Sequence, residues 1–384
     1  MLMKDLSECR ILIVDDIKAN VDILVEALRS QYKLSIALDG ENALRNAEKN
    51  PPDLVLLDIV MPGIDGYEVC RRLRASELTR EVPIMFLSSL EDVQNKARGF
   101  ELGANDYLTK PFEILEVQAR VRSLLKAKAY ADAVREAMER DLSIAREIQM
   151  GILPSDLSSC TKDTGLDIHA MIEPAKQVGG DLFEVLRVSD DRVVVVIGDV
   201  SGKGIPAALF MAVTVTLVRS MAKQLEQPDE ILRHLNNELV VQNPQGMFVT
   251  IACLVFDLRT GKVTAASAGH NPLVFIRPQE PPRFVFPATG TIAGLFPEFN
   301  ITSDSMMLAP DDMLVLYTDG VTEAFNPQGE LFGDERLLKC LSGKPKQNAA
   351  QTVASLLEAV RTYAAGTPQS DDITMVTVRY TPRQ

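Results

Sequence analysis

Short apolar runs alternate with amphipathic stretches over the first ~125 residues of the chain. The apolar runs are residues 11–14, 34–37, 54–57, 84–87 and 104–108, and the segments between them carry helical periodicity. Short apolar strands that alternate with helices indicate a parallel sheet covered on both faces. Five such units predict a doubly wound α/β domain of flavodoxin-like strand order over residues 1–125.

A different pattern fills residues 115–152, which contain no proline, one glycine and many charges, and which predict one long helix. Its heptad seam, with one polar break at Asp141, consists of Leu124, Ala127, Ala131, Val134, Met138, Asp141, Ala145, Ile148 and Ile152. This spacing is typical of a coiled coil, so residues 126–153 are predicted to form a helical linker that pairs two copies of the chain as a homodimer. The alternative is a helix that packs its apolar stripe on its own domains.

Beyond residue 166, runs rich in Val, Ile and Phe alternate with turns that contain Gly and Asp. Strands are expected at 192–197, 247–256, 273–276, 313–317 and 373–380, and helices at 206–225, 229–241 and 349–364. Strands in series with segregated helices predict an α+β sandwich of sheets flanked by helices over residues 154–384. The most apolar long stretch, 204–222, contains Arg219 and two threonines, so we expect a buried core helix and no membrane span.

The chain has 384 residues and a net charge of −13, which makes nucleic acid and anionic lipid unfavourable partners. Its five cysteines are scattered without a CxxC pair, which argues against a disulfide framework or a zinc site. The N-terminus lacks the basic and apolar regions of a signal peptide. Together these features predict a cytoplasmic protein.

Polar side chains follow four of the predicted parallel strands. Asp15 and Asp16 follow the first strand, Asp58 the third, Ser88 the fourth and Lys110 the fifth. The carboxyl ends of parallel strands form the binding edge of such a sheet, where three carboxylates would repel one another unless a hard cation such as Mg²⁺ lies among them. A carboxylate facing that cation can act as a nucleophile on phosphorus, and a hydroxyl and an ammonium can bind phosphoryl oxygens.

Residues 10 to about 125 resemble the receiver domains of bacterial response regulators, including MPGIDGYE at 61–68 and YLTKPF at 107–112. The resemblance implies that Asp58 is a phosphoacceptor, charged by a sensor histidine kinase or a phosphotransfer protein. The other implied roles are Mg²⁺ ligation by Asp15, Asp16, Asp58 and the Val60 carbonyl, phosphoryl contacts from Ser88 and Lys110, and an aromatic switch at Tyr107.

Aspartates in glycine-containing or polar motifs mark the second half of the chain: GGDLFE at 179–184, GDVSGKG at 198–204, YTDGVTEA at 317–324 and QSDDITMV at 369–376. Each alone is compatible with a β-turn, because Asp-Gly is a common turn pair. Four beside strands in one domain instead suggest carboxylates gathered from several strand ends. Without a His or Cys cluster, such oxygens suit Mg²⁺ or Mn²⁺ rather than zinc. Two such ions would clamp an in-line attack of water on phosphorus, which predicts phosphate-ester hydrolysis.

These motifs, with AREIQMGILP at 145–154 and AGHNP at 268–272, resemble the PPM-type serine/threonine phosphatases of the bacterial SpoIIE branch over roughly residues 140–380. The resemblance implies two Mn²⁺ or Mg²⁺ ions. The implied metal ligands are Asp181, Asp199, the Val200 carbonyl, Asp319 and Asp371, with Asp372 at an adjoining polar position. His270 is expected to be structural, and Lys203 to be solvated.

By resemblance, the substrate would be phosphoserine or phosphothreonine on a protein of the anti-sigma-factor antagonist type, with hydrolysis controlled by Asp58 phosphorylation. No DNA-binding motif follows the receiver-like segment. Two alternatives stay open: a non-catalytic adaptor that docks a partner through the phosphatase fold, and a phosphatase of small phosphate esters. The four retained metal-ligand aspartates favour an active enzyme.

Overall fold

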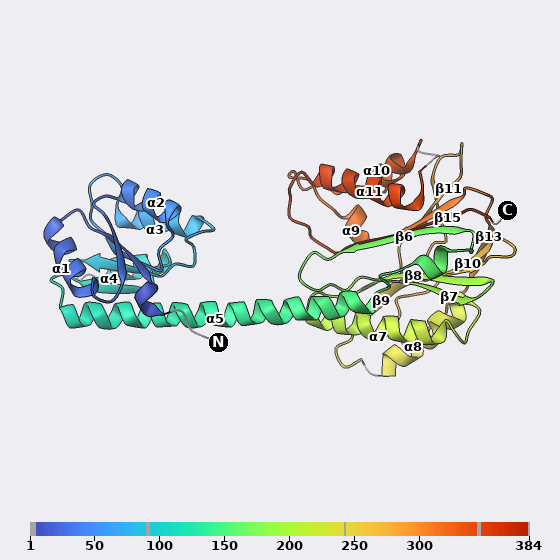
Figure 1. Cartoon of the computed structure of the whole chain (residues 1–384), viewed down its shortest axis with the longest axis horizontal. Coiled ribbons are helices and arrows are strands. Elements are labelled where there is room, and N and C mark those ends of the chain that lie inside the picture. Colours follow the sequence, from blue (N-terminus) through green and yellow to red (C-terminus); the bar gives the residue numbers. More distant parts are fainter. Residues whose placement is uncertain (1–4, 90–92, 242, 344–346, 383–384) are drawn as a thin grey trace. The chain divides into compact units, whose positions relative to one another are not determined.

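The computed structural model describes residues 5–89, 93–241, 243–343 and 347–382 (Figure 1). The chain divides into two compact units, residues 1–140 and 141–384. Helix α5 (Ile114–Ile152) crosses the boundary between them as one continuous element.

A five-stranded parallel sheet of order β2-β1-β3-β4-β5 forms the centre of the first unit. This order confirms the predicted doubly wound α/β fold. The strands are β1 (Arg10–Val14), β2 (Lys33–Ala37), β3 (Leu54–Asp58), β4 (Ile84–Ser88) and β5 (Asp106–Thr109). The helices before α5 are the short η1 (Leu6–Glu8), α1 (Lys18–Leu28), α2 (Gly40–Lys49), α3 (Gly66–Ala75) and α4 (Val93–Glu101).

Two apolar clusters cover the two faces of this sheet, which explains why its strands are apolar throughout. Leu24 of α1 and Val121 of α5 belong to one cluster, and Val69 of α3 and Tyr107 of β5 belong to the other. Aspartates begin two of the helices: Asp39 accepts a hydrogen bond from the Asn42 amide at the start of α2, and Asp65 caps α3 in the same way. The sheet and its helices therefore hold the β1 and β3 ends rigidly.

The predicted long helix is α5, and its heptad seam meets different surroundings along its length. At one end, Leu124 packs against the apolar core of the first unit, and at the other, Ile152 packs against the core of the second unit. Between them, the side chains of Val134, Met138 and Ile148 are 50%, 60% and 62% exposed. The ends of the seam therefore behave as the alternative interpretation expected, while its middle presents apolar side chains to solvent.

Two five-stranded antiparallel sheets form the second unit, of orders β13-β10-β9-β8-β7 and β12-β11-β14-β15-β6. They confirm the predicted sandwich. The strands are β6 (Leu166–Glu173), β7 (Leu182–Ser189), β8 (Arg192–Val200), β9 (Val249–Asp257), β10 (Lys262–Ala268), β11 (Leu273–Ile276), β12 (Arg283–Val285), β13 (Asp304–Met307), β14 (Met313–Tyr317) and β15 (Ile373–Tyr380).

Helices cover the outer faces of both sheets (Figure 1). The first sheet carries α7 (Ile205–Met221) and α8 (Pro228–Val241), and the second carries α9 (Asp319–Thr322), α10 (Gly333–Leu341) and α11 (Ala349–Ala364). The short α6 (Ser158–Thr161) precedes β6. Side chains from both sheets, among them Val196 and Val376, share one buried core. The ends of the central strands are consequently fixed relative to one another.

Helix α7 differs from the expected buried core helix. One face is buried through residues such as Met211 and Val215, but Ile205, Leu209 and Val213 are exposed. The apolar stretch is therefore a surface helix with apolar residues on both sides. Over the part of the chain that the structure describes, no helix combines the length and the apolar character needed to cross a bilayer.

Candidate functional site

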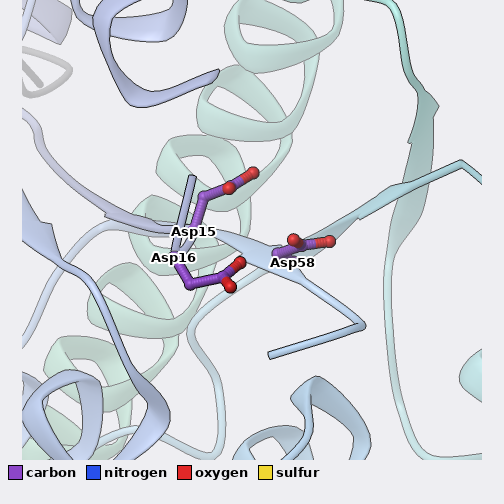
Figure 2. Close-up of side chains that lie close together, drawn as sticks. All are labelled: Asp15, Asp16 and Asp58. Carbon is purple, nitrogen blue, oxygen red and sulfur yellow. The ribbon is translucent and has the colours of Figure 1, made fainter. Parts of the chain in front are cut away.

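In the first unit, three carboxylates meet at the edge where β1 and β3 end. Asp15 and Asp16 follow β1, and Asp58 is the last residue of β3. Figure 2 shows their side chains close together, and one oxygen from each lies within 4.8 Å of the others. Asp15 and Asp58 are buried, whereas Asp16 is exposed. The predicted convergence of these three residues is therefore present in the fold.

The Lys110 ammonium offsets two of these charges. Its Nζ lies 2.7 Å from Asp58 and 2.8 Å from Asp15. Burial raises the pKa of Asp58, and the ammonium opposes that rise. Asp15 also accepts hydrogen bonds from the Ile17 amide at 2.9 Å and from the Asn20 side chain at 3.1 Å. The sequence reasoning missed Asn20, whose contribution depends on how α1 packs beside β1.

The other predicted residues of this edge occupy different depths. Ser88, the last residue of β4, is buried, and its carbonyl accepts a hydrogen bond from the Lys110 amide at 2.8 Å. Val60 is 65% exposed beside Asp58. Tyr107 is turned inward, and its ring packs against Phe86 and Phe100 at centroid distances of 5.4 and 5.2 Å. Burial raises the pKa of Tyr107 to about 12.

In the second unit, strand ends from both sheets carry the predicted aspartates. Asp181 precedes β7 and Asp199 lies near the end of β8, and the register pairs Leu182 with Gly198, which sets the two aspartates side by side. Asp319 follows β14 as the first residue of α9, and Asp371 precedes the adjacent β15. The fold thus collects two carboxylates from each sheet.

The charges of these carboxylates influence one another's ionisation. Burial, and then the charges of Asp319 and Asp371, raise the pKa of Asp199 to about 7. Burial and the charge of Asp199 raise the pKa of Asp181, and burial raises that of Asp319. Their oxygens are spread more widely than in the first unit: within the described ranges, three carboxylate oxygens lie within 4.8 Å of one another only at Asp15, Asp16 and Asp58.

Two threonine hydroxyls hold Asp181 in place. Thr318, which follows β14, and Thr374 of β15 are both buried, and they donate to Oδ2 of Asp181 at 2.8 and 2.6 Å. Thr318 Oγ1 also accepts a hydrogen bond from the Thr374 amide at 3.0 Å. Sequence reasoning missed both threonines, although each stands within three residues of a predicted metal ligand.

Asp372 holds the loop that carries Asp181 in place through hydrogen bonds. Its two oxygens accept hydrogen bonds from the backbone amides of Ala175 and Gly180, both at 2.8 Å. Gly179 has to be glycine here, because a Cβ would lie 2.0 Å from Asp372 Oδ2. Asp372 therefore shapes the GGD loop.

Two further polar residues border the site. Lys203 is exposed, as expected for a solvated side chain, and its ammonium lies 2.9 Å from Asp371 and 2.7 Å from the Ser370 carbonyl. His270 is buried, and its Nδ1 lies 2.9 Å from the Thr250 hydroxyl. Burial lowers the pKa of His270 to about 4.

Comparison with known proteins identifies both units. A family model described as response regulator receiver domain matches residues 11–122, and one described as Stage II sporulation protein E (SpoIIE) matches residues 189–381, half of the chain. Protein IcfG of Synechocystis is 30% identical over 276 residues, which cover 65% of this chain and 43% of that protein. Response regulator PleD of Caulobacter vibrioides is 44% identical over 128 residues, 33% of this chain and 28% of PleD. The chain thus spans less than half the length of these two relatives.

Solved structures show the same fold in the second unit. The SiaA-PP2C domain of Pseudomonas aeruginosa is similar, with a TM-score of 0.58 and 22% identity, over 65% of this chain and 99% of that one. At this identity the likeness concerns the fold alone, and the family match carries the assignment. The chain therefore belongs to the SpoIIE family of PPM-type phosphatases, and it carries a response regulator receiver domain before its phosphatase domain.

Proposed function

We propose that this chain is a metal-dependent protein serine/threonine phosphatase whose activity is set by phosphorylation of Asp58. The observation that carries the catalytic part is the convergence of Asp181, Asp199, Asp319 and Asp371 from two sheets. Burial and neighbouring negative charges raise the pKa values of Asp181, Asp199 and Asp319. Carboxylates that repel one another at strand ends are suited to holding divalent cations.

The donor set fits Mn²⁺ or Mg²⁺, because it offers carboxylate oxygens and the Val200 carbonyl without a His or Cys ligand. When bound, two such ions would supply an activated water and stabilise the charge that develops on the phosphoryl group. Asp181, Asp199, Val200, Asp319 and Asp371 would hold them. Thr318 and Thr374 orient Asp181, and Asp372 fixes the preceding loop, so the ligand geometry is set before a substrate arrives.

In the receiver, Asp58 is the proposed phosphoacceptor, with a sensor histidine kinase or phosphotransfer protein as the phosphodonor. Asp15, Asp16 and the Val60 carbonyl would hold Mg²⁺ beside it. The Lys110 ammonium, 2.7 Å from Asp58, would then pair with the phosphoryl oxygens. Ser88 adds a hydroxyl contact and Tyr107 responds to its position. The proposed substrate of the phosphatase domain is a phosphoserine or phosphothreonine on an anti-sigma-factor antagonist.

Hydrolysis of an aryl phosphate by the full chain with Mn²⁺, with and without beryllofluoride as a mimic of phosphorylated Asp58, tests both parts. We expect Mn²⁺-dependent turnover that changes with beryllofluoride. Asp319→Asn should abolish turnover, and Asp58→Asn should keep turnover but remove the response. A response that survives in Asp58→Asn would place beryllofluoride in the phosphatase site and refute receiver control. Absence of turnover in every condition would favour the adaptor function instead.

The middle of α5 supports a proposal on the linker, residues 126–153. The exposed apolar side chains of Val134, Met138 and Ile148 keep heptad spacing, which suits a parallel partner helix from a second copy. Phosphorylation would then act through the register or angle of the paired helices. Analytical ultracentrifugation should show a dimer that Met138→Glu weakens. A monomer with and without beryllofluoride would contradict this proposal.

A further inference from the structure

The end of α5 reaches the GGD loop through one buried side chain. Gln149 is only 5% exposed. Its Nε2 donates to the Gly179 carbonyl at 2.6 Å, and its Oε1 accepts from the Gly179 amide at 3.2 Å. The side-chain amide of Gln149 therefore satisfies both the backbone carbonyl and the backbone amide of Gly179. A loop residue held in this way cannot shift without breaking two hydrogen bonds.

Gly179 stands two residues before Asp181, so its position determines where that carboxylate begins. On the other side of the loop, Asp372 holds the Gly180 amide. A Cβ on Gly180 would lie 2.6 Å from the Val200 carbonyl and 3.4 Å from Asp199 Oδ1. The loop is therefore packed between the linker helix and the proposed metal-binding groups of β8, with little room to move toward them.

Arg146 lies one turn earlier on α5 and contacts the same loop. Its guanidinium donates to the carbonyls of Lys176 and Gln177 at 3.4 and 3.3 Å. Positions 146 and 149 share a face of the helix. At the helix end, Arg219 of α7 donates to the Ile152 carbonyl at 2.8 Å and pairs with the buried Glu184 of β7. The last turns of α5 are thus attached to both ends of the segment that carries Asp181.

A buried glutamine at a helix end has a simpler interpretation, in which it only satisfies backbone groups and anchors the helix. That role would affect folding stability but not metal affinity in particular. Here the Gln149 amide contacts Gly179, which stands two positions before the proposed ligand Asp181. A rotation of α5 would therefore displace Gly179 first. The two interpretations therefore differ in what a Gln149 variant does to metal binding.

We propose that Gln149 is a positioning residue for the metal site of the phosphatase domain: its two hydrogen bonds to Gly179 hold the GGD loop where Asp181 can bind metal. The proposal rests on the proposed metal-dependent function. It makes the last turn of the linker helix part of the metal site. A displacement of α5 would therefore change metal affinity without moving Asp199, Asp319 or Asp371.

Mn²⁺ titration of the full chain, followed by the electron paramagnetic resonance signal of free Mn²⁺, tests the proposal. The binding component lost in Asp319→Asn identifies the phosphatase site and separates it from the receiver. Gln149→Met keeps the size and burial of the side chain but removes both hydrogen bonds. We expect this component to weaken about tenfold, equivalent to about 1.4 kcal/mol. Saturating Mn²⁺ should return kcat toward the unmodified value.

Met150→Ala is the matched control, because Met150 packs on the core from the next position of α5 and makes no polar contact with the loop. It should lower the melting temperature but leave Mn²⁺ affinity within about twofold of the unmodified chain. Should Gln149→Met fail to fold, Gln149→Asn, which keeps the amide but not the reach, serves the same measurement. Unchanged affinity in the Gln149 variant, or equal weakening in Met150→Ala, would overturn the proposal. An unmodified chain without the Asp319-dependent component would instead refute the metal-dependent function itself.

Discussion

Replacing Thr374 by Val should weaken metal binding in the phosphatase domain while leaving the shape of the core unchanged. The hydroxyl of Thr374 donates to the fully buried Asp181 at 2.6 Å. Hydrogen bonds to charged groups contribute about 1.5–3 kcal/mol. Thr318 still holds the same oxygen in this variant, so we take the lower end, about 1.5 kcal/mol. If this entire free energy is lost from metal binding, Mn²⁺ affinity falls about tenfold.

Thr377→Val on the same strand provides the matched control. Thr377 is fully buried, and its hydroxyl lacks a hydrogen-bond partner among the described residues. Valine has nearly the same shape, and removal of a buried unpaired hydroxyl relieves a desolvation cost of about 1–3 kcal/mol. This variant should therefore be as stable as the unmodified chain or more stable, with unchanged metal dependence. Comparison of Thr374→Val with Thr377→Val separates the effect of losing a hydroxyl in β15 from the effect of losing the hydrogen bond to Asp181.

The assay is Mn²⁺-dependent hydrolysis of an aryl phosphate over a range of Mn²⁺ concentrations, with thermal melting of both variants. Thr374→Val should raise the Mn²⁺ concentration for half-maximal rate about tenfold, with the KM of the phosphate ester changed less. Equal Mn²⁺ dependence in Thr374→Val and Thr377→Val would refute the reasoning, because it would mean that Asp181 needs no hydroxyl to bind metal.

Two further predictions concern buried groups outside the metal ligands. Burial lowers the pKa of His270 from 6.5 to about 4. Its contribution to stability is therefore complete above pH 6.5 and is lost as pH falls toward 4. Between pH 7 and pH 5, urea denaturation should show that His270→Gln loses about 2 kcal/mol less stability than the unmodified chain. In the receiver, a Cβ at Gly99 would lie 1.5 Å from the Tyr107 hydroxyl oxygen, so Gly99→Ala should cost about 1–3 kcal/mol. The cost should be smaller in Tyr107→Phe, and a double-mutant cycle without coupling would contradict this packing.

Much of the fold could be predicted because its signals are local. The strands at 273–276, 313–317 and 373–380 and the helix at 349–364 coincide with the predicted ranges, since long apolar runs and an amphipathic stretch mark them. No range was predicted for β6, β7, β10, β12 or β13. β6 is half exposed along most of its length and mixes Asp167 and His169 with apolar residues, so its pattern is weaker than that of a buried strand.

The acidic residues of both sites could be predicted because each stands beside a strand, and strand ends are readable in the sequence. Their supporting contacts could not, because those contacts join residues that are far apart in the chain. Thr374 reaches Asp181 across 193 positions, and Asp372 reaches Gly180 across 192. Such pairs exist only once the two sheets are stacked. The ion pair of Lys203 was missed for the same reason, since its partner Asp371 comes from the other sheet.

The two acidic sites balance their charge differently, and this difference predicts how each domain responds to metal. In the receiver, Lys110 already lies within 2.8 Å of both Asp15 and Asp58. In the phosphatase domain, Lys203 reaches Asp371, whereas Asp181, Asp199 and Asp319 have raised pKa values that reflect burial and mutual repulsion. Divalent cations should therefore stabilise the phosphatase domain more than the receiver.

Thermal unfolding at pH 8 with EDTA or with saturating Mn²⁺ measures this difference. A ligand present at about 100 times its dissociation constant adds about 2.7 kcal/mol to the stability of the domain that binds it. Mn²⁺ should raise the stability of the phosphatase domain by about that amount and the stability of the receiver by less. Asp319→Asn should remove most of the increase in the phosphatase domain and leave the increase in the receiver unchanged. A larger shift in the receiver would mean that Lys110 does not compensate its carboxylates as the 2.7 and 2.8 Å distances indicate. It would also mean that the four phosphatase aspartates tolerate one another without a cation.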